Sequence, residues 1–157
     1  LTTNALNRTI FITLGAYGCQ NITTNGSYTL EQNVNNYTGI CCINITASNV
    51  TFNGQGFTID GQDTLTPTTY GICVNTAGAV NLTNVTIRNV TLTDWAYGIY
   101  ENKTSNSTIN NVSSSSGMVG IKIDSSSNNN ISSSLLHFCP ILEGYSLSSF
   151  EILTISQ

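Results

Sequence analysis

The phrase YGICV at residues 70–74 returns as YGIYE at 97–101, as VGIKI at 119–123 and, more weakly, as EGYSL at 143–147. The glycines of these four phrases are 27, 22 and 24 residues apart, at Gly71, Gly98, Gly120 and Gly144. A second phrase keeps the same beat, as NVTIRNV from Asn84, NSTINNV from Asn106 and NNISSS from Asn129. Two phrases that share one period indicate a repeated structural unit.

Each repeat consists of short apolar alternations that Gly, Asn and Asp interrupt, such as Val85 and Ile87 followed by Val90 and Leu92. A period of two residues between turn-forming residues is typical of short strands. No stretch of ten residues shows the 3.6-residue periodicity of a helix. Short strands in a repeat near 22 residues predict an all-β fold, a single right-handed parallel β-helix of about six short coils that takes up residues 1–157. In such a stack we expect the amides of asparagines in neighbouring coils to bond to one another, and Tyr70 to stack on Tyr97.

Within residues 26–61, the sequence reads GSYTLEQNV at 26–34 and CCINITASNVTFNGQGFTIDG at 41–61. This segment resembles the opening coils of right-handed parallel β-helix proteins of the pectin-lyase-like and NosD type, which carry G-x-Y-x-L and then I-x-A-x-N-V-T-x-x-G-x-G-x-x-I-x-G. The later GI phrases are similar to the downstream coils of that group, so the likeness covers about residues 26–135. The resemblance implies the β-helix fold and a place among prokaryotic, including archaeal, cell-surface proteins. It implies no single activity, because the group includes lyases, hydrolases and surface proteins.

Charged residues are scarce, since Asp, Glu, Lys and Arg together make up 8% of the chain. With four basic residues and a net charge of −4, the chain cannot form the positive face that nucleic acid or an anionic membrane surface requires. No apolar run approaches the length of a membrane span. Composition therefore predicts neither a nucleic-acid partner nor a membrane span.

The asparagines carry a strong glycosylation signal. Asn-x-Ser/Thr occurs at 13 of the 21 asparagines, against roughly 5 or 6 expected by chance for this motif. The sites are Asn7, Asn21, Asn25, Asn36, Asn44, Asn49, Asn81, Asn84, Asn89, Asn102, Asn106, Asn111 and Asn130. Part of the excess has another reading, in which Asn and Thr simply alternate on a solvated strand face. We expect covalent N-glycans on a secreted protein, and the first residue, Leu1, is what a processed N-terminus would leave.

Five cysteines without CxxC or CxxH spacing favour disulfides over metal binding. Cys19 and Cys41 are 22 residues apart, one coil, so we expect them to pair. Cys42 and Cys73 would pair as well once the insertion at 61–69 is discounted, because Cys41 and Cys42 point to opposite faces of a strand. Cys139 is left either as a buried thiol or as a bridge to an end segment or another chain.

The two ends, residues 1–18 and 143–157, read as strands that are apolar in part on both faces. They fold back as caps, or they pair with a neighbouring subunit by strand addition or coil stacking. A head-to-tail contact that does not close produces a filament, so we expect a homo-oligomer or polymer.

Catalytic and metal-binding patterns are weak. Asp60 and Asp63 could ligate calcium, although a solvated turn is the better interpretation, and Asp94 and Asp124 could approach one another from neighbouring coils. His137 and Met118 are the only histidine and methionine, which gives copper binding no support. We therefore expect no enzyme activity, no catalytic residues, no metal site and no cofactor.

The aromatic group Trp95, Tyr97 and Tyr100 stands beside Asp94 and is a possible ligand-binding site for sugars, or it packs within the stack. The sequence as a whole favours an extracellular structural subunit of a glycosylated filament, sheath or cell-surface layer, assembled through the ends of its β-helix. The alternative is a carbohydrate-binding or adhesive cell-surface module centred on the three aromatic residues.

Overall fold

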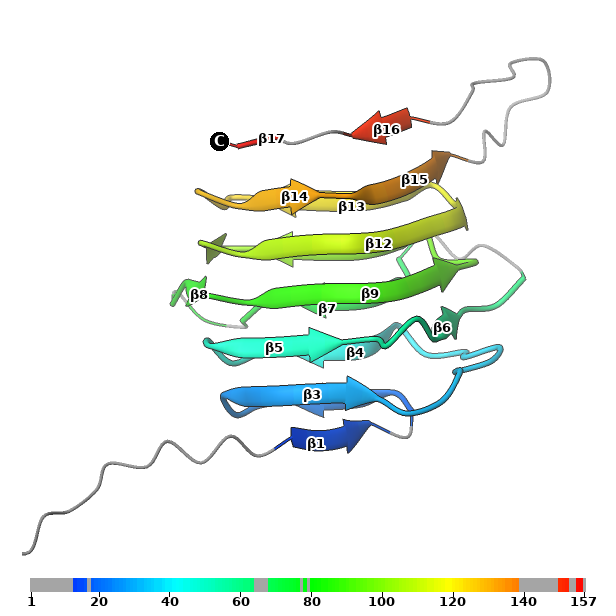
Figure 1. Ribbon diagram of the computed structural model, residues 1–157, viewed down its shortest axis with the longest axis horizontal. Helices are drawn as coiled ribbons and strands as arrows, with labels where there is room; N and C mark the ends of the chain where they lie inside the picture. Colours follow the sequence, from blue (N-terminus) through cyan, green and yellow to red (C-terminus); the bar gives the residue numbers. More distant parts are fainter. Residues whose placement is uncertain are drawn as a thin grey trace, which may run out of the picture.

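The computed structural model describes residues 13–16, 18–63, 68–76, 78, 80–138, 150–152 and 155–156. Its strands are stacked like the rungs of a ladder (Figure 1). This part of the chain contains no helix, and hence none long and apolar enough to cross a membrane. The predicted all-β fold, a single parallel β-helix, is confirmed.

The strands form three sheets. The ten-stranded sheet contains β1 (Thr13–Ala16), β3 (Gly26–Leu30), β5 (Val50–Asn53), β6 (Thr58–Asp60), β9 (Thr86–Thr93), β12 (Thr108–Gly117), β14 (Asn130–Ser132), β15 (Ser134–Phe138), β16 (Phe150–Ile152) and β17 (Ile155–Ser156). The five-stranded sheet contains β2 (Gln20–Ile22), β4 (Cys41–Ile45), β7 (Tyr70–Val74), β10 (Tyr97–Asn102) and β13 (Val119–Asp124). A third, two-stranded sheet pairs β8 (Leu82–Thr83) with β11 (Thr104–Ser105).

The core consists of columns of equivalent side chains, one from each coil. In the ten-stranded sheet the register aligns Tyr28, Phe52, Ile87, Ile109 and Ile131, all of which are buried. In the five-stranded sheet it aligns Ile43, Ile72, Ile99 and Ile121. Because the side chains of a strand alternate between its faces, every second residue of strands such as β5 enters this core and its neighbours face outward. Burial of these columns supplies the main stabilisation of the fold.

The stack has about five turns, since the five-stranded sheet takes one strand from each coil, against the six or so expected. The coils differ in length: Gln20 aligns with Ile43, Ile43 with Ile72, and Ile99 with Ile121. Residues 61–69 lengthen one coil, as the sequence suggested, and the last strands turn back instead of adding a further coil.

The ends differ from one another. At the N-terminal end β1 adds a parallel strand beneath β3. At the C-terminal end β16 pairs antiparallel with β15, and β17 pairs antiparallel with β14. The C-terminal strands therefore cover the last coil, as a cap would. Residues 1–12, 139–149, 153, 154 and 157, with Asn7 and Cys139 among them, lie outside the described part of the chain.

Candidate functional site

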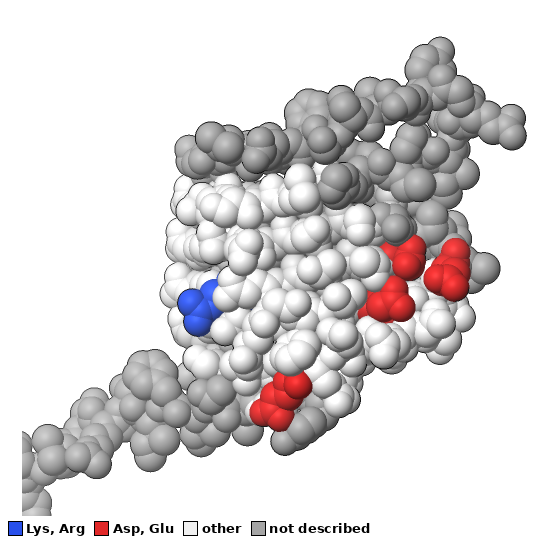
Figure 2. Space-filling view, turned by 45° about the vertical axis from the view of Figure 1, so that its right-hand side comes forward, with Lys and Arg blue, Asp and Glu red and all other residues white. Residues whose placement is uncertain are grey.

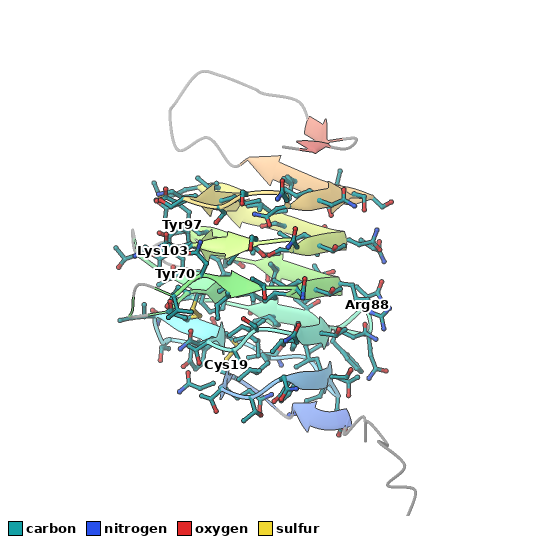
Figure 3. All side chains as sticks on the ribbon, turned by 90° about the vertical axis from the view of Figure 1, so that its left-hand side faces the viewer. Cys19, Tyr70, Arg88, Tyr97 and Lys103 are labelled. Atoms are coloured by element: carbon teal, nitrogen blue, oxygen red, sulfur yellow. A yellow bond between two sulfur atoms is a disulfide. The ribbon has the colours of Figure 1, made fainter. Side chains whose placement is uncertain are left out.

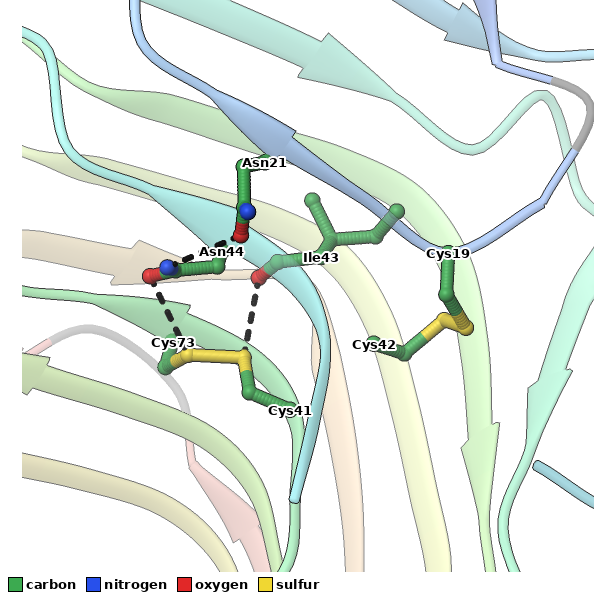
Figure 4. The surroundings of a disulfide bond; sticks show 7 residues. All are labelled: Cys19, Asn21, Cys41, Cys42, Ile43, Asn44 and Cys73. Atoms are coloured by element: carbon green, nitrogen blue, oxygen red, sulfur yellow. Dashed lines mark hydrogen bonds between the residues drawn. A yellow bond between two sulfur atoms is a disulfide. The ribbon is translucent and has the colours of Figure 1, made fainter. Parts of the chain in front are cut away.

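The four cysteines in the described part of the chain form two disulfides that join neighbouring coils (Figure 4). Cys19 pairs with Cys42, and Cys41 pairs with Cys73. The expected partners were therefore wrong, although the four residues involved were right. The first coil contains 23 residues rather than 22, as the alignment of Gln20 with Ile43 shows, so Cys42 lies one coil above Cys19.

Cys41 and Cys42 do point to different sides, as expected, because Cys42 is buried and Cys41 is partly exposed. Cys73 follows Asn44 in the outward column that begins with Asn21, so it meets the outward-facing Cys41. The two bridges together link the coils that contain β2, β4 and β7. The first three coils are thus covalently joined.

Asparagines stand above one another at two corners of the coil. The register aligns five of them at the first corner, Asn25, Asn49, Asn84, Asn106 and Asn128. At the second corner Asn89 aligns with Asn111. All of these except Asn25 have a positive φ, between 50° and 57°. Asn tolerates this left-handed conformation better than most residues, because its short side chain can hydrogen-bond locally.

The amides bond from coil to coil, as the sequence predicted. Asn44 Nδ2 donates to Asn21 Oδ1 at 3.1 Å, and Asn84 Nδ2 donates to Asn49 Oδ1 at 3.0 Å. A three-membered ladder runs from Asn111 Nδ2 to Asn89 Oδ1, at 2.9 Å, and from Asn89 Nδ2 to Asn53 Oδ1, at 3.0 Å.

The corners also explain part of the Asn-x-Ser/Thr excess. After the left-handed Asn49 the next residue, Val50, points into the core, and the one after it, Thr51, points outward. The same sequence of directions follows Asn84 and Asn89. The fold thus favours Asn at the corner and a polar residue two positions later. The twelve motif asparagines in the described part of the chain are all exposed or partly exposed.

The three aromatic residues do not lie together: Trp95 packs within the stack, which was one of the two expectations, and Tyr97 and Tyr100 lie on the surface. Trp95 is buried, with an exposed fraction of 2%, and its Nε1 donates to Ile59 O at 3.0 Å. It is therefore a core residue and cannot form a sugar-stacking platform with Tyr97 and Tyr100. Gly61 leaves the space that the indole occupies, because a Cβ at Gly61 would be 3.1 Å from Trp95 Cδ2.

Tyr97 and Tyr100 instead form a surface cluster with Tyr70, and Figure 3 shows Tyr70 and Tyr97 one above the other. The ring centroids of Tyr70 and Tyr97 are 5.3 Å apart, and those of Tyr70 and Tyr100 are 5.2 Å apart, which confirms the predicted stacking. Lys122 Nζ lies 5.5 Å from the centroids of both Tyr97 and Tyr100, a cation–π arrangement. Burial, with the nearby charge of Asp124, raises the pKa of Tyr100. The ring faces are largely engaged within this cluster.

A buried carboxyl group was not anticipated. Glu101 is fully buried and occupies the inward column that holds Ile22, Ile45, Val74 and Ile123 in the other coils. The alignment of YGIYE with YGICV and VGIKI contained this signal, since it sets Glu101 opposite Val74 and Ile123. Burial raises the pKa of Glu101 to about 7, against the smaller opposing influence of the Thr104 and Ser107 hydroxyls.

Other charged groups are few, and the acidic ones on the face in Figure 2 gather mainly towards one side of it. The face in Figure 2 is mostly uncharged. Asp94 directly follows β9 of the ten-stranded sheet, one position past the residue that aligns with Ser115. Asp124 aligns with Asn102 in the five-stranded sheet. The two aspartates therefore belong to different sides of the coil, and their suggested approach is wrong. Asp60 accepts hydrogen bonds from Thr93 Oγ1 at 2.6 Å and from the backbone N of Asn36 at 3.1 Å, which fits a turn better than a calcium site. Among the described residues no three His, Cys, Asp or Glu side chains lie close enough to hold a metal ion.

A shallow groove of about 260 Å³ crosses β9, β12 and β15. Its lining is mixed: Asn89 and Asn111 provide amides, Thr91 and Ser113 hydroxyls, and Leu135 an apolar side chain. It holds no acid or base, so nothing in its lining supports acid–base catalysis.

Comparison of the chain with protein-family models, with curated proteins and with solved structures gives no match.

Proposed function

We propose that this chain is a structural subunit of an extracellular, glycosylated filament, sheath or cell-surface layer. The observation that carries the proposal is the division of the side chains between the inside and the outside of the stack. The coils direct their apolar side chains into one continuous core and present Asn, Thr and Ser outward. Such a stack is rigid along its axis and offers a long, uncharged side.

The disulfides fit an extracellular location, because disulfides persist in oxidising compartments. The exposure of the motif asparagines fits glycan attachment, which needs an accessible acceptor. The corner geometry accounts for the asparagines alone. It does not require Thr or Ser, rather than another polar residue, two positions later, so the glycosylation motif keeps its weight.

The N-terminal edge is the proposed joint. Within the described residues β1 pairs only with β3, and β2 pairs only with β4, so each strand has one edge without a partner. An unpaired strand edge is a template for pairing with another chain. Addition of this edge to the β16–β17 end of the next copy produces a head-to-tail contact along the stack, and such a contact extends into a filament when it does not close into a ring.

Electron microscopy and intact mass of the natively purified protein test the proposal together. We expect filaments or sheets, and a mass several kilodaltons above the 16.8 kDa of the polypeptide. A chain without residues 1–18 should lose assembly. The control Thr86→Lys places a charge on the side of the stack and should retain end-to-end assembly. A monomer at the bare polypeptide mass would contradict both the polymer and the glycans.

The carbohydrate-binding alternative has less support, because Trp95 is buried and the tyrosine rings stack on one another. Binding of labelled polysaccharides that Tyr97→Ala abolishes and Tyr97→Phe retains would establish it in place of the structural role.

A further inference from the structure

The interior changes character between two neighbouring coils. The coil of β7 and β8 directs Val74, Leu82 and Val85 inward, and all three are buried. The next coil has buried polar residues at the equivalent positions. Glu101 aligns with Val74, Thr104 with Leu82, and Ser107 with Val85. Burying a polar group without a full set of hydrogen bonds destabilises a fold, so this polar layer needs an explanation.

The hydrogen bonds of the layer fit a protonated carboxyl group. Thr104 Oγ1 lies 3.1 Å from Glu101 Oε2 and also 3.1 Å from Ser126 Oγ. A hydroxyl has a single hydrogen, so Thr104 donates to only one of the two. Ser126 Oγ uses its own hydrogen toward Asp124 O, at 2.7 Å. When Glu101 is protonated, its carboxyl group donates to Thr104 and Thr104 donates to Ser126. Every donor in this series of hydrogen bonds then has an acceptor.

Ionisation breaks this arrangement. Thr104 must then donate to the carboxylate, and its bond to Ser126 is lost. The other carboxylate oxygen, Glu101 Oε1, is buried and makes no hydrogen bond of good geometry, and neither does Ser107 Oγ, although that hydroxyl is near enough to lower the Glu101 pKa. A buried carboxylate with one hydrogen bond is strongly unfavourable unless water enters.

Among the side chains that the structure describes, no charge compensates the carboxylate. From the neighbouring strands Val74 of β7 and Ile123 of β13 align with Glu101. The titratable and charged groups of the surrounding elements are on the outside: Lys122 and Asp124 of β13 are exposed, and Lys103, Tyr97, Tyr100 and Tyr70 are partly exposed. None of them contributes to the pKa of Glu101, which burial raises and the Thr104 and Ser107 hydroxyls lower.

The two halves of the stack are held together differently. The disulfides join the coils from Cys19 to Cys73, and the described coils beyond β9 contain no disulfide. In a stack each coil contacts mainly its neighbours, so one end can open while the other stays folded. The polar layer lies in the part without bridges.

We propose that residues 97–138 open as a unit controlled by pH, with Glu101 as the switch, while the disulfide-bonded coils stay closed. The unit is closed when the Glu101 carboxyl is protonated. It loosens when the carboxyl ionises, because water must then reach Oε1. This inference concerns the fold alone and stands whether or not the chain forms filaments.

Hydrogen–deuterium exchange of the full, oxidised chain tests the proposal, with each rate divided by that of an unprotected peptide at the same pH. The shift of the Glu101 pKa from 4.5 to about 7 corresponds to a roughly 300-fold change in the opening equilibrium. Peptides from 97–138 should lose protection between pH 4.5 and pH 8 by up to this factor, and peptides from 41–60 should not. Glu101→Gln, which stays neutral, should remove the difference, and the exposed-site control Glu31→Gln should keep it. Equal protection at both pH values, or an equal loss in both regions, would overturn the proposal.

A second measurement needs no variant. The chain contains four glutamates, so side-chain carboxyl labelling gives four signals in an NMR titration. One of them should titrate near pH 7, together with amide shifts in β10, β11 and β13. If all four titrate in the ordinary range of exposed carboxyls, Glu101 is not the switch.

Discussion

The backbone carbonyl of Gly120 lies against the position that a Gly98 side chain would occupy. A Cβ built on Gly98 would be 2.5 Å from Gly120 O and would also collide with Ser114 Oγ. Gly71 has the same relationship one coil earlier, where a Cβ would lie 2.8 Å from Gly98 O. At Gly71 and Gly98 the glycine of the repeat is therefore required by the close approach of consecutive coils.

Gly98→Ala should destabilise the protein by about 2 kcal/mol or more, because the coils must separate to admit the methyl group. Urea denaturation measures the change in the free energy of unfolding. Gly18→Ala is the matched control, since a Cβ there meets no other group within 4 Å. A Gly98→Ala variant as stable as the control would show that the coils can move apart freely.

The stability of the protein should fall as pH rises from about 4.5 to about 7. The pKa of Glu101 is raised in the folded state, so the folded protein retains this proton over a range in which the unfolded chain has lost it. The full effect is about 3 kcal/mol, present below the unfolded pKa and lost above the folded one. Urea denaturation at several pH values should show this slope for the native sequence and not for Glu101→Gln. At pH 8 the variant should be the more stable protein, and a lower stability there would contradict the burial argument.

The disulfide pairing can be tested with paired serine variants. Removing both partners of one bridge, in Cys19→Ser with Cys42→Ser, should leave the other bridge intact. Removing one partner of each, in Cys19→Ser with Cys41→Ser, should expose two additional thiols to an alkylating reagent. The pairing expected from equal coils predicts the opposite result, so counting thiols in the unfolded, unreduced chains distinguishes the two. Loss of either bridge should lower stability by about 3 kcal/mol.

The fold could be predicted because its periodic features are written directly in the sequence. Glycine recurs where a Cβ would have no space, at Gly71, Gly98 and Gly120. Asparagine recurs at corners that need a positive φ, such as Asn84 and Asn106. The disulfide partners could not be predicted reliably. One extra residue in the first coil shifts the alignment from Cys41 to Cys42, and such a shift reverses the face of every side chain.

The candidate site was harder to predict, because the direction in which each side chain points depends on backbone bends that cannot be read from the sequence. Trp95 follows the left-handed Asp94, and this turn directs the indole into the core, whereas Tyr97 and Tyr100 remain outside. Glu101 could have been found by aligning the repeats. Its burial follows from its column, and a charged residue in an apolar column departs from the pattern of its own fold.

Asn89 offers a test of the corner asparagines, because it lies in the middle of the ladder and has a φ of 53°. Asn89→Ala removes its bonds to Asn53 and Asn111 and places Ala, which tolerates the left-handed region less well than Asn, at this position. We expect a loss of about 2 kcal/mol, combining the lost hydrogen bonds with backbone strain. Asn89→Gly removes the same bonds without the strain, so its stability in urea should lie between those of the native sequence and Asn89→Ala. If the two variants are equally unstable, the ladder matters and the left-handed backbone does not; if Asn89→Gly matches the native sequence, the corner needs only a permissive backbone.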